Sequence, residues 1–151
     1  MNFPNKIFLL VDDDKDDRDL FVEAIESIKI MVKCHVSHNG QGALDLLSGL
    51  SDHLPHVIFL DINMPVMNGW DCLRKLKADD KYKNIPVIMC STSSSRGESK
   101  TAFDLGALCF CTKPDSFSIL KQTLEIVSNN LGENLLDAIK KSNIRSFQFK
   151  K

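Results

Sequence analysis

The sequence lacks an excess of charge of either sign. Its 19 Lys and Arg residues almost balance its 20 Asp and Glu residues, which gives a formal net charge of −1. Proteins that bind nucleic acid or anionic membranes usually carry a strong basic field. We therefore expect neither nucleic acid nor a membrane among its partners.

Long apolar runs and paired cysteines are also lacking. The first apolar run, residues 7–11, is far too short for a signal peptide or a membrane span, and an acidic triplet follows it. The five cysteines are an odd number without paired spacing, and several lie inside apolar runs. Such cysteines are typical of reduced core residues, so we expect a cytoplasmic protein.

What the sequence does contain is an alternation of apolar runs and helical stretches. At 151 residues, with 43% hydrophobic and 26% charged residues, the chain has the size and composition of one globular domain. The alternation predicts a parallel sheet with helices on both faces. The expected strands are 7–11, 31–36, 57–60, 87–90 and 108–112. The expected helices are 14–29, 43–50, 70–79, 98–105 and 116–129.

The last part of the sequence lies outside this alternation. Residues 131–151 predict a further helix over 133–141, followed by a basic segment with interspersed aromatic residues. This stretch is too short for a second domain. The expected organisation is one domain over residues 1–130 and a C-terminal extension over 131–151, with no output domain.

Polar residues follow four of the expected strands. Asp12 and Asp13 follow the first strand, Asp61 the third, Ser91 the fourth and Lys113 the fifth. The carboxyl ends of parallel strands lie along one edge of an open sheet, where ligands bind. The sequence therefore predicts that three carboxylates, a hydroxyl and an ammonium group lie together, a combination suited to a divalent cation and a phosphoryl group.

These side chains divide into metal ligands and groups for phosphoryl transfer. Mg²⁺ prefers oxygen ligands, usually one or two carboxylates together with water and phosphate. We expect Asp13 to bind the metal directly, Asp12 to act through water, and the backbone carbonyl of Asn63 to be a further ligand. Asp14 more naturally begins the next helix, where an acidic residue complements the helix dipole.

The transfer itself needs an acceptor and groups that neutralise charge. Asp61 ends an apolar strand before a loop that contains Pro65, so its carboxylate is exposed at the sheet edge as a phosphoryl acceptor. Lys113 and the Ser91 hydroxyl can each contact a phosphoryl oxygen. Each of these signals alone is common in solvated turns and loops. Their joint occurrence at successive strand ends is what favours a site.

The motifs together resemble the receiver domain of two-component response regulators, of the stand-alone chemotaxis type. The resemblance covers residues 6–129 and rests on these segments: Leu10-Val11-Asp12-Asp13-Asp14, Leu60-Asp61-Ile62-Asn63-Met64-Pro65, Met67-Asn68-Gly69, Ile85-Pro86-Val87-Ile88-Met89 and Lys113-Pro114. It implies a flavodoxin-like, doubly wound five-stranded parallel sheet of order 2-1-3-4-5. It also implies that a histidine kinase or phosphotransfer protein phosphorylates Asp61, with Mg²⁺ or Mn²⁺ as cofactor.

The resemblance further implies a switch. In that family a hydroxyl residue moves toward the phosphoryl group while an aromatic residue of the fifth strand rotates inward, and Ser91 and Phe110 match these positions. The family usually has a cis peptide at the position of Lys113-Pro114. Residues two places after the acceptor and the hydroxyl residue, here Asn63 and Ser93, tune the lifetime of the phosphoryl group.

Partner contacts are expected on the fourth helix, the fifth strand and the fifth helix. The candidate contact residues there are Arg96, Lys100, Phe110 and Phe117. With no output domain expected, the response has to pass through another protein, which the sequence does not identify. We expect a monomer or weak dimer that is not an enzyme beyond its own phosphorylation and dephosphorylation.

Three alternatives share parts of this pattern. A phosphatase of the haloacid dehalogenase type needs a second Asp where this chain has Asn63, and it needs a cap. A flavodoxin needs a Ser/Thr/Gly phosphate loop where this chain has three Asp residues. A receiver-shaped interaction module without phosphorylation also stays open, although the complete acidic site argues against it. Outside the site, Cys109 and Cys111 are expected in the core, and Trp70 is expected at a helix start near the site loop.

Overall fold

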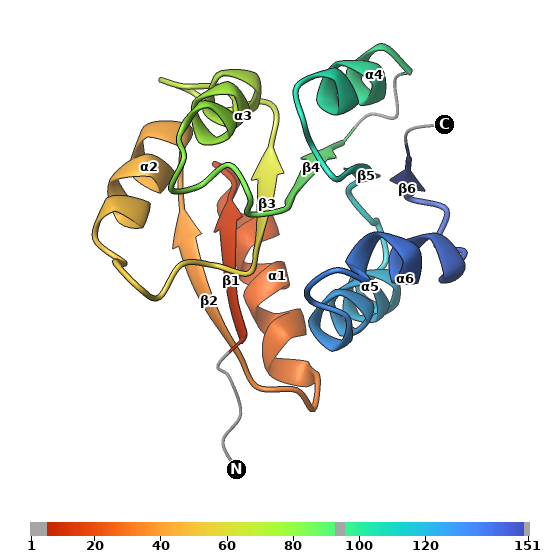
Figure 1. The fold of residues 1–151 in the computed structure, drawn as a ribbon. Coiled ribbons are helices and arrows are strands. Elements are labelled where there is room, and N and C mark those ends of the chain that lie inside the picture. Colours follow the sequence, from red (N-terminus) through yellow and green to blue (C-terminus); the bar gives the residue numbers. More distant parts are fainter. Residues whose placement is uncertain (1–5, 93–95, 150–151) are drawn as a thin grey trace.

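A six-stranded sheet forms the centre of the computed structural model, which describes residues 6–92 and 96–149 (Figure 1). The strand order is β2-β1-β3-β4-β5-β6. The strands are β1 (Lys6–Val11), β2 (Val32–Ser37), β3 (Val57–Asp61), β4 (Val87–Ser91), β5 (Cys109–Thr112) and β6 (Phe147–Gln148). The helices are α1 (Lys15–Ser27), α2 (Gly40–Ser48), α3 (Gly69–Ala78), α4 (Arg96–Asp104), α5 (Phe117–Asn129) and α6 (Leu135–Lys141).

The five predicted strands pair in parallel in the predicted order, so the flavodoxin-like fold is confirmed. Helices cover both faces of the sheet, and successive residues of β3 enter opposite cores. Ile58 and Leu60 pack on the side of α2, α3 and α4. Val57 and Phe59 pack on the side of α1, α5 and α6. Because both faces are covered, every residue of β3 is buried, which explains its apolar sequence from Val57 to Leu60.

Four helices begin with a side-chain cap directly after a loop at the carboxyl edge of the sheet. Asp14, Asn39, Asn68 and Ser116 each accept a hydrogen bond from the backbone N–H three residues later. Such caps satisfy backbone donors that the helix leaves free. They fix where α1, α2, α3 and α5 start and so hold the loops of this edge. The expected role of Asp14 as a helix-start residue is confirmed.

The sheet has one strand more than the five predicted. The sequence predicts a helix and then a basic segment in the extension, and this segment also contains β6, which pairs antiparallel with β5 and places Phe147 opposite Cys111 and Gln148 opposite Phe110. A two-residue strand carries no periodicity that sequence reasoning could detect. It forms because β5 would otherwise be an edge strand with unpaired backbone groups. The predicted helix in the extension is confirmed as α6.

The Lys113–Pro114 peptide also differs from the expectation. Within residues 6–92 and 96–149 no peptide bond is cis, so this bond is trans. The trans form of an X–Pro bond is favoured by about 0.5–1 kcal/mol in the absence of other constraints. One peptide earlier, the backbone N–H of Lys113 donates to the carbonyl of Ser91 at 2.7 Å and ties the exit of β5 to β4.

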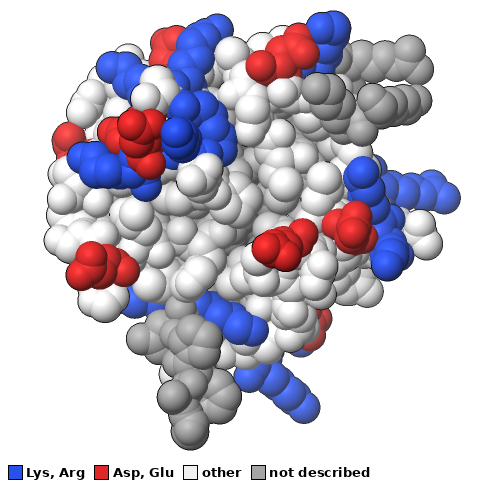
Figure 2. Space-filling model, in the orientation of Figure 1, with Lys and Arg blue, Asp and Glu red and all other residues white. Residues whose placement is uncertain are grey.

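The remaining expectations from composition concern charge and cysteines. On the face seen in Figure 2, acidic and basic side chains are interspersed, as a net charge of −1 suggests. All five cysteines are free, and Cys109 and Cys111 pack in the core beside α1 and α5, as predicted. Burial raises the pKa of the Cys111 thiol to about 12. In the described part of the chain, no helix is both long and apolar enough to cross a membrane.

Candidate functional site

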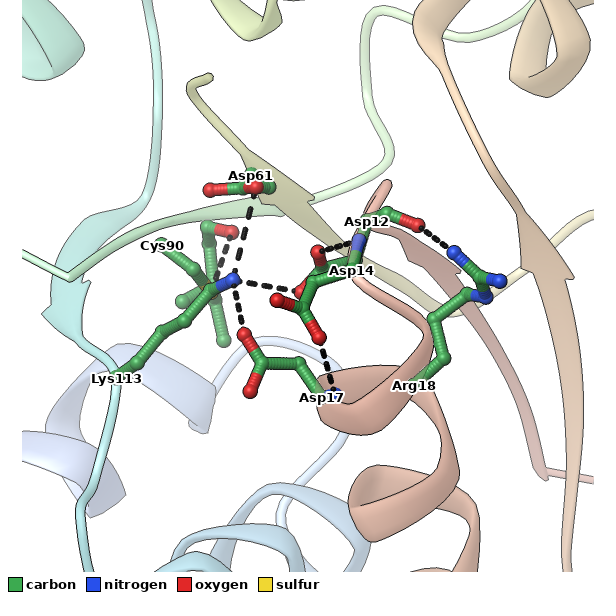
Figure 3. Close-up of polar contacts among 8 residues, drawn as sticks. Asp12, Asp14, Asp17, Arg18, Asp61, Cys90 and Lys113 are labelled. Carbon is green, nitrogen blue, oxygen red and sulfur yellow. Dashed lines mark hydrogen bonds and ion pairs between the residues drawn. The ribbon is translucent and has the colours of Figure 1, made fainter. Parts of the chain in front are cut away.

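The candidate site lies where β1, β3 and β5 end. Asp12 follows β1, Asp61 is the last residue of β3 and Lys113 follows β5, and their side chains point toward one another (Figure 3). Two backbone hydrogen bonds continue the ladders past these strand ends: Asp12 N–H donates to Ser37 O at 3.0 Å, and Ile62 N–H donates to Cys90 O at 3.1 Å. The sheet itself therefore fixes the two carboxylates.

Three carboxylates of this edge can approach one cation. Asp12, Asp13 and Asp61 each offer an oxygen, and these oxygens lie within 4.8 Å of one another. Asp12 and Asp61 are buried, at 3% and 6% exposure, so the expected exposure of the Asp61 carboxylate is wrong. Asp13 is exposed and keeps the cluster open to solvent. Hard divalent cations such as Mg²⁺ and Mn²⁺ prefer carboxylate oxygens with room for water. The residues present fit such an ion.

Lys113 lies in the middle of the acidic groups. Its Nζ is 2.7 Å from Asp12 Oδ2, 2.8 Å from Asp17 Oδ2 and 3.6 Å from Asp61 Oδ2. Asp17 is a site residue that sequence reasoning missed. An acidic residue in the first turn of a helix is accounted for by the helix dipole alone, but the Asp14 cap also fixes this turn so that Asp17 faces Lys113.

Burial, together with the charged groups around it, shifts the pKa of Asp61. Burial raises the pKa of this carboxyl from 3.8 to about 6; Lys113 opposes the increase, and the neighbouring Asp12 and Asp13 add to it. Burial alone would lower the pKa of Lys113, but its hydrogen bonds to Asp12 and Asp17 raise the pKa above its usual value. Lys113 therefore stays positively charged, and it lies beside Asp61, a carboxyl group whose ionisation is disfavoured by burial.

An apolar cavity contributes to this burial. It has a volume of about 80 Å³ and lies under Lys113, between α1 and α5. Phe21, Phe59 and Leu124 line it, together with Asp61. Asp12, Asp17 and Lys113 also line this cavity, so Asp61 lies where hydrocarbon meets charged groups and is largely withdrawn from solvent; this loss of solvation raises its pKa.

The loop after β3 folds tightly over Asp61. Gly69 N–H donates to Ile62 O at 2.8 Å. A Cβ at Gly69 would collide with the Asp61 carbonyl oxygen and would come within 2.8 Å of Ile62 Cα. A glycine is thus required for this close approach. Trp70 follows it and packs, partly buried, against the core beside α2 and α3, which agrees with its predicted place at a helix start. Asn63 is exposed in the same loop, and its carbonyl as a metal ligand stays a prediction.

Ser91 and Phe110, the predicted switch residues, are both fully buried. Phe110 already points into the core on the side of α2, α3 and α4. Phe110 as a partner-contact residue is therefore wrong for this conformation. Phe117 is 40% exposed, and Lys100 is exposed and pairs with Asp104 at 2.7 Å. Ser93 and the side chain of Arg96 lie outside the described residues.

Comparisons with known proteins agree with this arrangement. A family model described as the response regulator receiver domain matches residues 8–125. Chemotaxis protein CheY1 of Helicobacter pylori (strain J99 / ATCC 700824) is 41% identical over 78 residues, which covers 52% of this chain and 60% of that protein. The chain thus spans less than two thirds of the length of this curated relative.

Two solved structures are also similar. The Mn²⁺-bound form of response regulator Rcp1 is 27% identical with a TM-score of 0.73, and the similarity covers 85% of this chain and 96% of that one. The phosphorylated cyanobacterial phytochrome response regulator RcpA is 28% identical with a TM-score of 0.75, covering 85% of this chain and 94% of that one.

Proposed function

The chain belongs to the family of response regulator receiver domains, and we propose that it accepts a phosphoryl group on Asp61 in a reaction that needs Mg²⁺ or Mn²⁺. The observation that carries this proposal is the convergence of Asp12, Asp13 and Lys113 on Asp61 at one sheet edge. The proposed donor is the phosphohistidine of a histidine kinase or phosphotransfer protein. Similarity to a Mn²⁺-bound and to a phosphorylated response regulator supports the proposed metal ion and the proposed phosphorylation, respectively.

In the proposed step, a carboxylate oxygen of Asp61 attacks the phosphorus atom of the donor. The new O–P bond forms as the P–N bond of the phosphohistidine breaks, and the imidazole leaves with the electron pair. With a pKa of about 6, Asp61 is mostly ionised at neutral pH and able to attack. A bound cation would neutralise charge on the phosphoryl oxygens, and Asp12, Asp13 and Asp61 are the residues that would hold it.

Lys113 has a second role in this scheme. Its ammonium group now binds Asp12 and Asp17 and lies 3.6 Å from Asp61. A divalent cation at this cluster would compete with Lys113 for the Asp12 carboxylate, directly or through a water molecule, and would leave the ammonium group free to contact a phosphoryl oxygen. The buried hydroxyl of Ser91 would supply a further hydrogen bond.

The proposed output is a change in partner binding. A phosphoryl group adds about −1.5 to −2 charge together with new acceptor oxygens, and it draws Ser91 and Lys113 toward Asp61. The conformations favoured in this way would bind a downstream protein through α4, β5 and α5. We further propose that the protein acts in the cytoplasm as a monomer or weak dimer, and that its only catalysis is its own phosphorylation and dephosphorylation.

Incubation with acetyl phosphate and Mg²⁺, followed by intact mass measurement, tests this proposal. The wild type is expected to gain one phosphoryl group, and EDTA is expected to prevent the gain. Asp61→Asn is expected to gain none. Asp45→Asn, which removes an exposed carboxylate of α2 that pairs with Gln41, is the matched control and is expected to behave as the wild type.

Two results would overturn the proposal. An adduct that persists in Asp61→Asn would place the chemistry on another residue. Absence of an adduct under every condition would favour the alternative of an interaction module without phosphorylation.

A further inference from the structure

The segment after α6 closes the edge of the sheet. Residues 142–149, called the strap here, turn back from α6 so that β6 lies along β5 (Figure 1). The contact includes a hydrogen bond from Thr112 N–H to Ser146 O of 2.8 Å. The strap therefore occupies backbone groups of β5 that would otherwise be open to another chain.

The two ends of the extension are held very differently. α6 is anchored by Leu135 and Ile139, which are 2% and 1% exposed and belong to the core beside α5. The strap itself contributes a two-residue strand and one buried aromatic side chain, Phe147, while Ile144 and Phe149 are only partly buried against the same core. A ladder this short opens far more easily than the body of a sheet.

Two features next to the ladder weaken the closed position further. The hydroxyl of Ser146 is buried, and among the described residues its one side-chain neighbour for a hydrogen bond is the Cys111 thiol, a weak partner. This hydroxyl would regain hydrogen bonds to water if the strap opened. An open groove of about 900 Å³ lies between the strap and the start of α5, so this side of the strap is accessible to water.

The strap is connected to the phosphorylation site by two adjacent residues. The amide of Thr112 donates to the strap at Ser146, and the amide of Lys113 donates to Ser91 O on β4 at 2.7 Å. The same Lys113 carries the ammonium group that faces Asp61. A movement of Lys113 is therefore a movement at the end of β5, next to the point where the strap is bound.

We propose that the strap is an autoinhibitory cover on the β5 edge, which phosphorylation of Asp61 releases; this rests on the function proposed above. A phosphoryl group on Asp61 draws Lys113 and Ser91 toward it and shifts the end of β5. The strap cannot follow this shift, because α6 ties it to the core beside α5. The ladder opens, and the backbone edge of β5 becomes available to a partner. By reciprocity, a strap that is held closed disfavours the phosphorylated state at equilibrium. We expect the rate of phosphorylation to fall as well, because the end of β5 then has to shift against the closed strap.

Amide hydrogen exchange, followed by NMR with and without acetyl phosphate and Mg²⁺, tests the release. The Thr112 amide reports the contact with the strap, and the Lys113 amide reports the contact with β4. We expect exchange at Thr112 to become about tenfold or more faster in the phosphorylated protein. Exchange at Lys113 is expected to change much less, which distinguishes release of the strap from general loosening of β5.

Two variants test the reciprocal effect. Phe147→Cys places a thiol opposite Cys111, at a cross-strand pair adjacent to the hydrogen-bonded Thr112–Ser146 pair. Such non-hydrogen-bonded pairs have Cα atoms about 4.5 Å apart, within the range of a disulfide. Oxidation is expected to lock the strap and to slow phosphorylation severalfold relative to the same variant when reduced; peptide mapping confirms the bridge.

Gln148→Pro removes a ladder N–H without removing a buried side chain, and it is expected to speed phosphorylation, with Gln148→Thr as control.

The results separate this proposal from the proposed function. A phosphoryl adduct on Asp61 with unchanged Thr112 exchange overturns the strap and leaves the function intact. Equal phosphorylation rates in the oxidised and reduced Phe147→Cys protein, or in Gln148→Pro and Gln148→Thr, overturn the coupling. Absence of any adduct overturns the function and the strap proposal together.

Discussion

Asp61→Asn is expected to stabilise the metal-free protein at neutral pH. In the folded protein the pKa of Asp61 is about 6, against a usual value of 3.8. Between these values the native state binds more protons than the unfolded state. The free energy of unfolding of the wild type therefore falls as pH rises from about 4 to about 6 and stays lowered above that. Asparagine does not ionise, so the variant lacks this loss.

The size of the effect follows from the pKa shift. A shift of about two pKa units corresponds to about 3 kcal/mol. Solvent at the open sheet edge screens part of it, so a stabilisation of about 1–2 kcal/mol at pH 7 is expected. Below pH 4 the wild type and the variant should have the same stability, because Asp61 is then protonated in both folded and unfolded chains.

Urea denaturation in EDTA at a series of pH values measures this difference. Asp45→Asn is again a suitable control, since it removes a carboxylate for which no such burial exists. A variant that is less stable than the wild type at pH 7, or a difference that does not depend on pH between 4 and 7, would refute the reasoning about the buried acid. Mg²⁺ should reverse the order, because it stabilises only the protein whose carboxylates hold it.

Three further predictions concern neighbours of Asp61. Gly69→Ala should lower the free energy of unfolding by about 1–3 kcal/mol, because its Cβ meets backbone atoms of Asp61 and Ile62; urea melts with no loss would contradict this. Lys113→Ala should cost about 2–3 kcal/mol in EDTA, because it leaves buried carboxylates unpaired, and Mg²⁺ should restore part of it; equal losses with and without Mg²⁺ would argue against a cation site. Fluorescence of Trp70, the single tryptophan, should change when Mg²⁺ is titrated. Unchanged fluorescence would show that Trp70 does not sense cation binding at the site.

Much of the fold could be predicted because burial leaves a direct trace in a sequence. β3 is buried on both faces and reads as an apolar run from Val57 to Leu60, and α3 shows buried residues at helical spacing. Parallel order then brings Asp12, Asp61 and Lys113 to one edge whatever the loops do. The parallel order of the strands was therefore enough to name the candidate metal ligands Asp12, Asp13 and Asp61.

The features that the sequence did not reveal depend on contacts between distant segments. β6 exists because β5 offers an open edge, and its two residues carry no pattern of their own. Asp17 reaches Lys113 across 96 residues of sequence, yet its place in the first turn of α1 gave it a sufficient local explanation. The peptide before Pro114 is trans where the family resemblance implies cis, and no local sequence pattern decides between the two forms.

The most direct test of the central claim is to locate the phosphoryl group itself. The protein is treated with acetyl phosphate and Mg²⁺, then reduced with borohydride, which converts an aspartyl phosphate into homoserine, and digested for peptide mass mapping. Homoserine at position 61, absent when EDTA replaces Mg²⁺, is the result that the site geometry predicts. Homoserine at position 12 or 13, or at no position, would contradict the assignment of Asp61 as the acceptor.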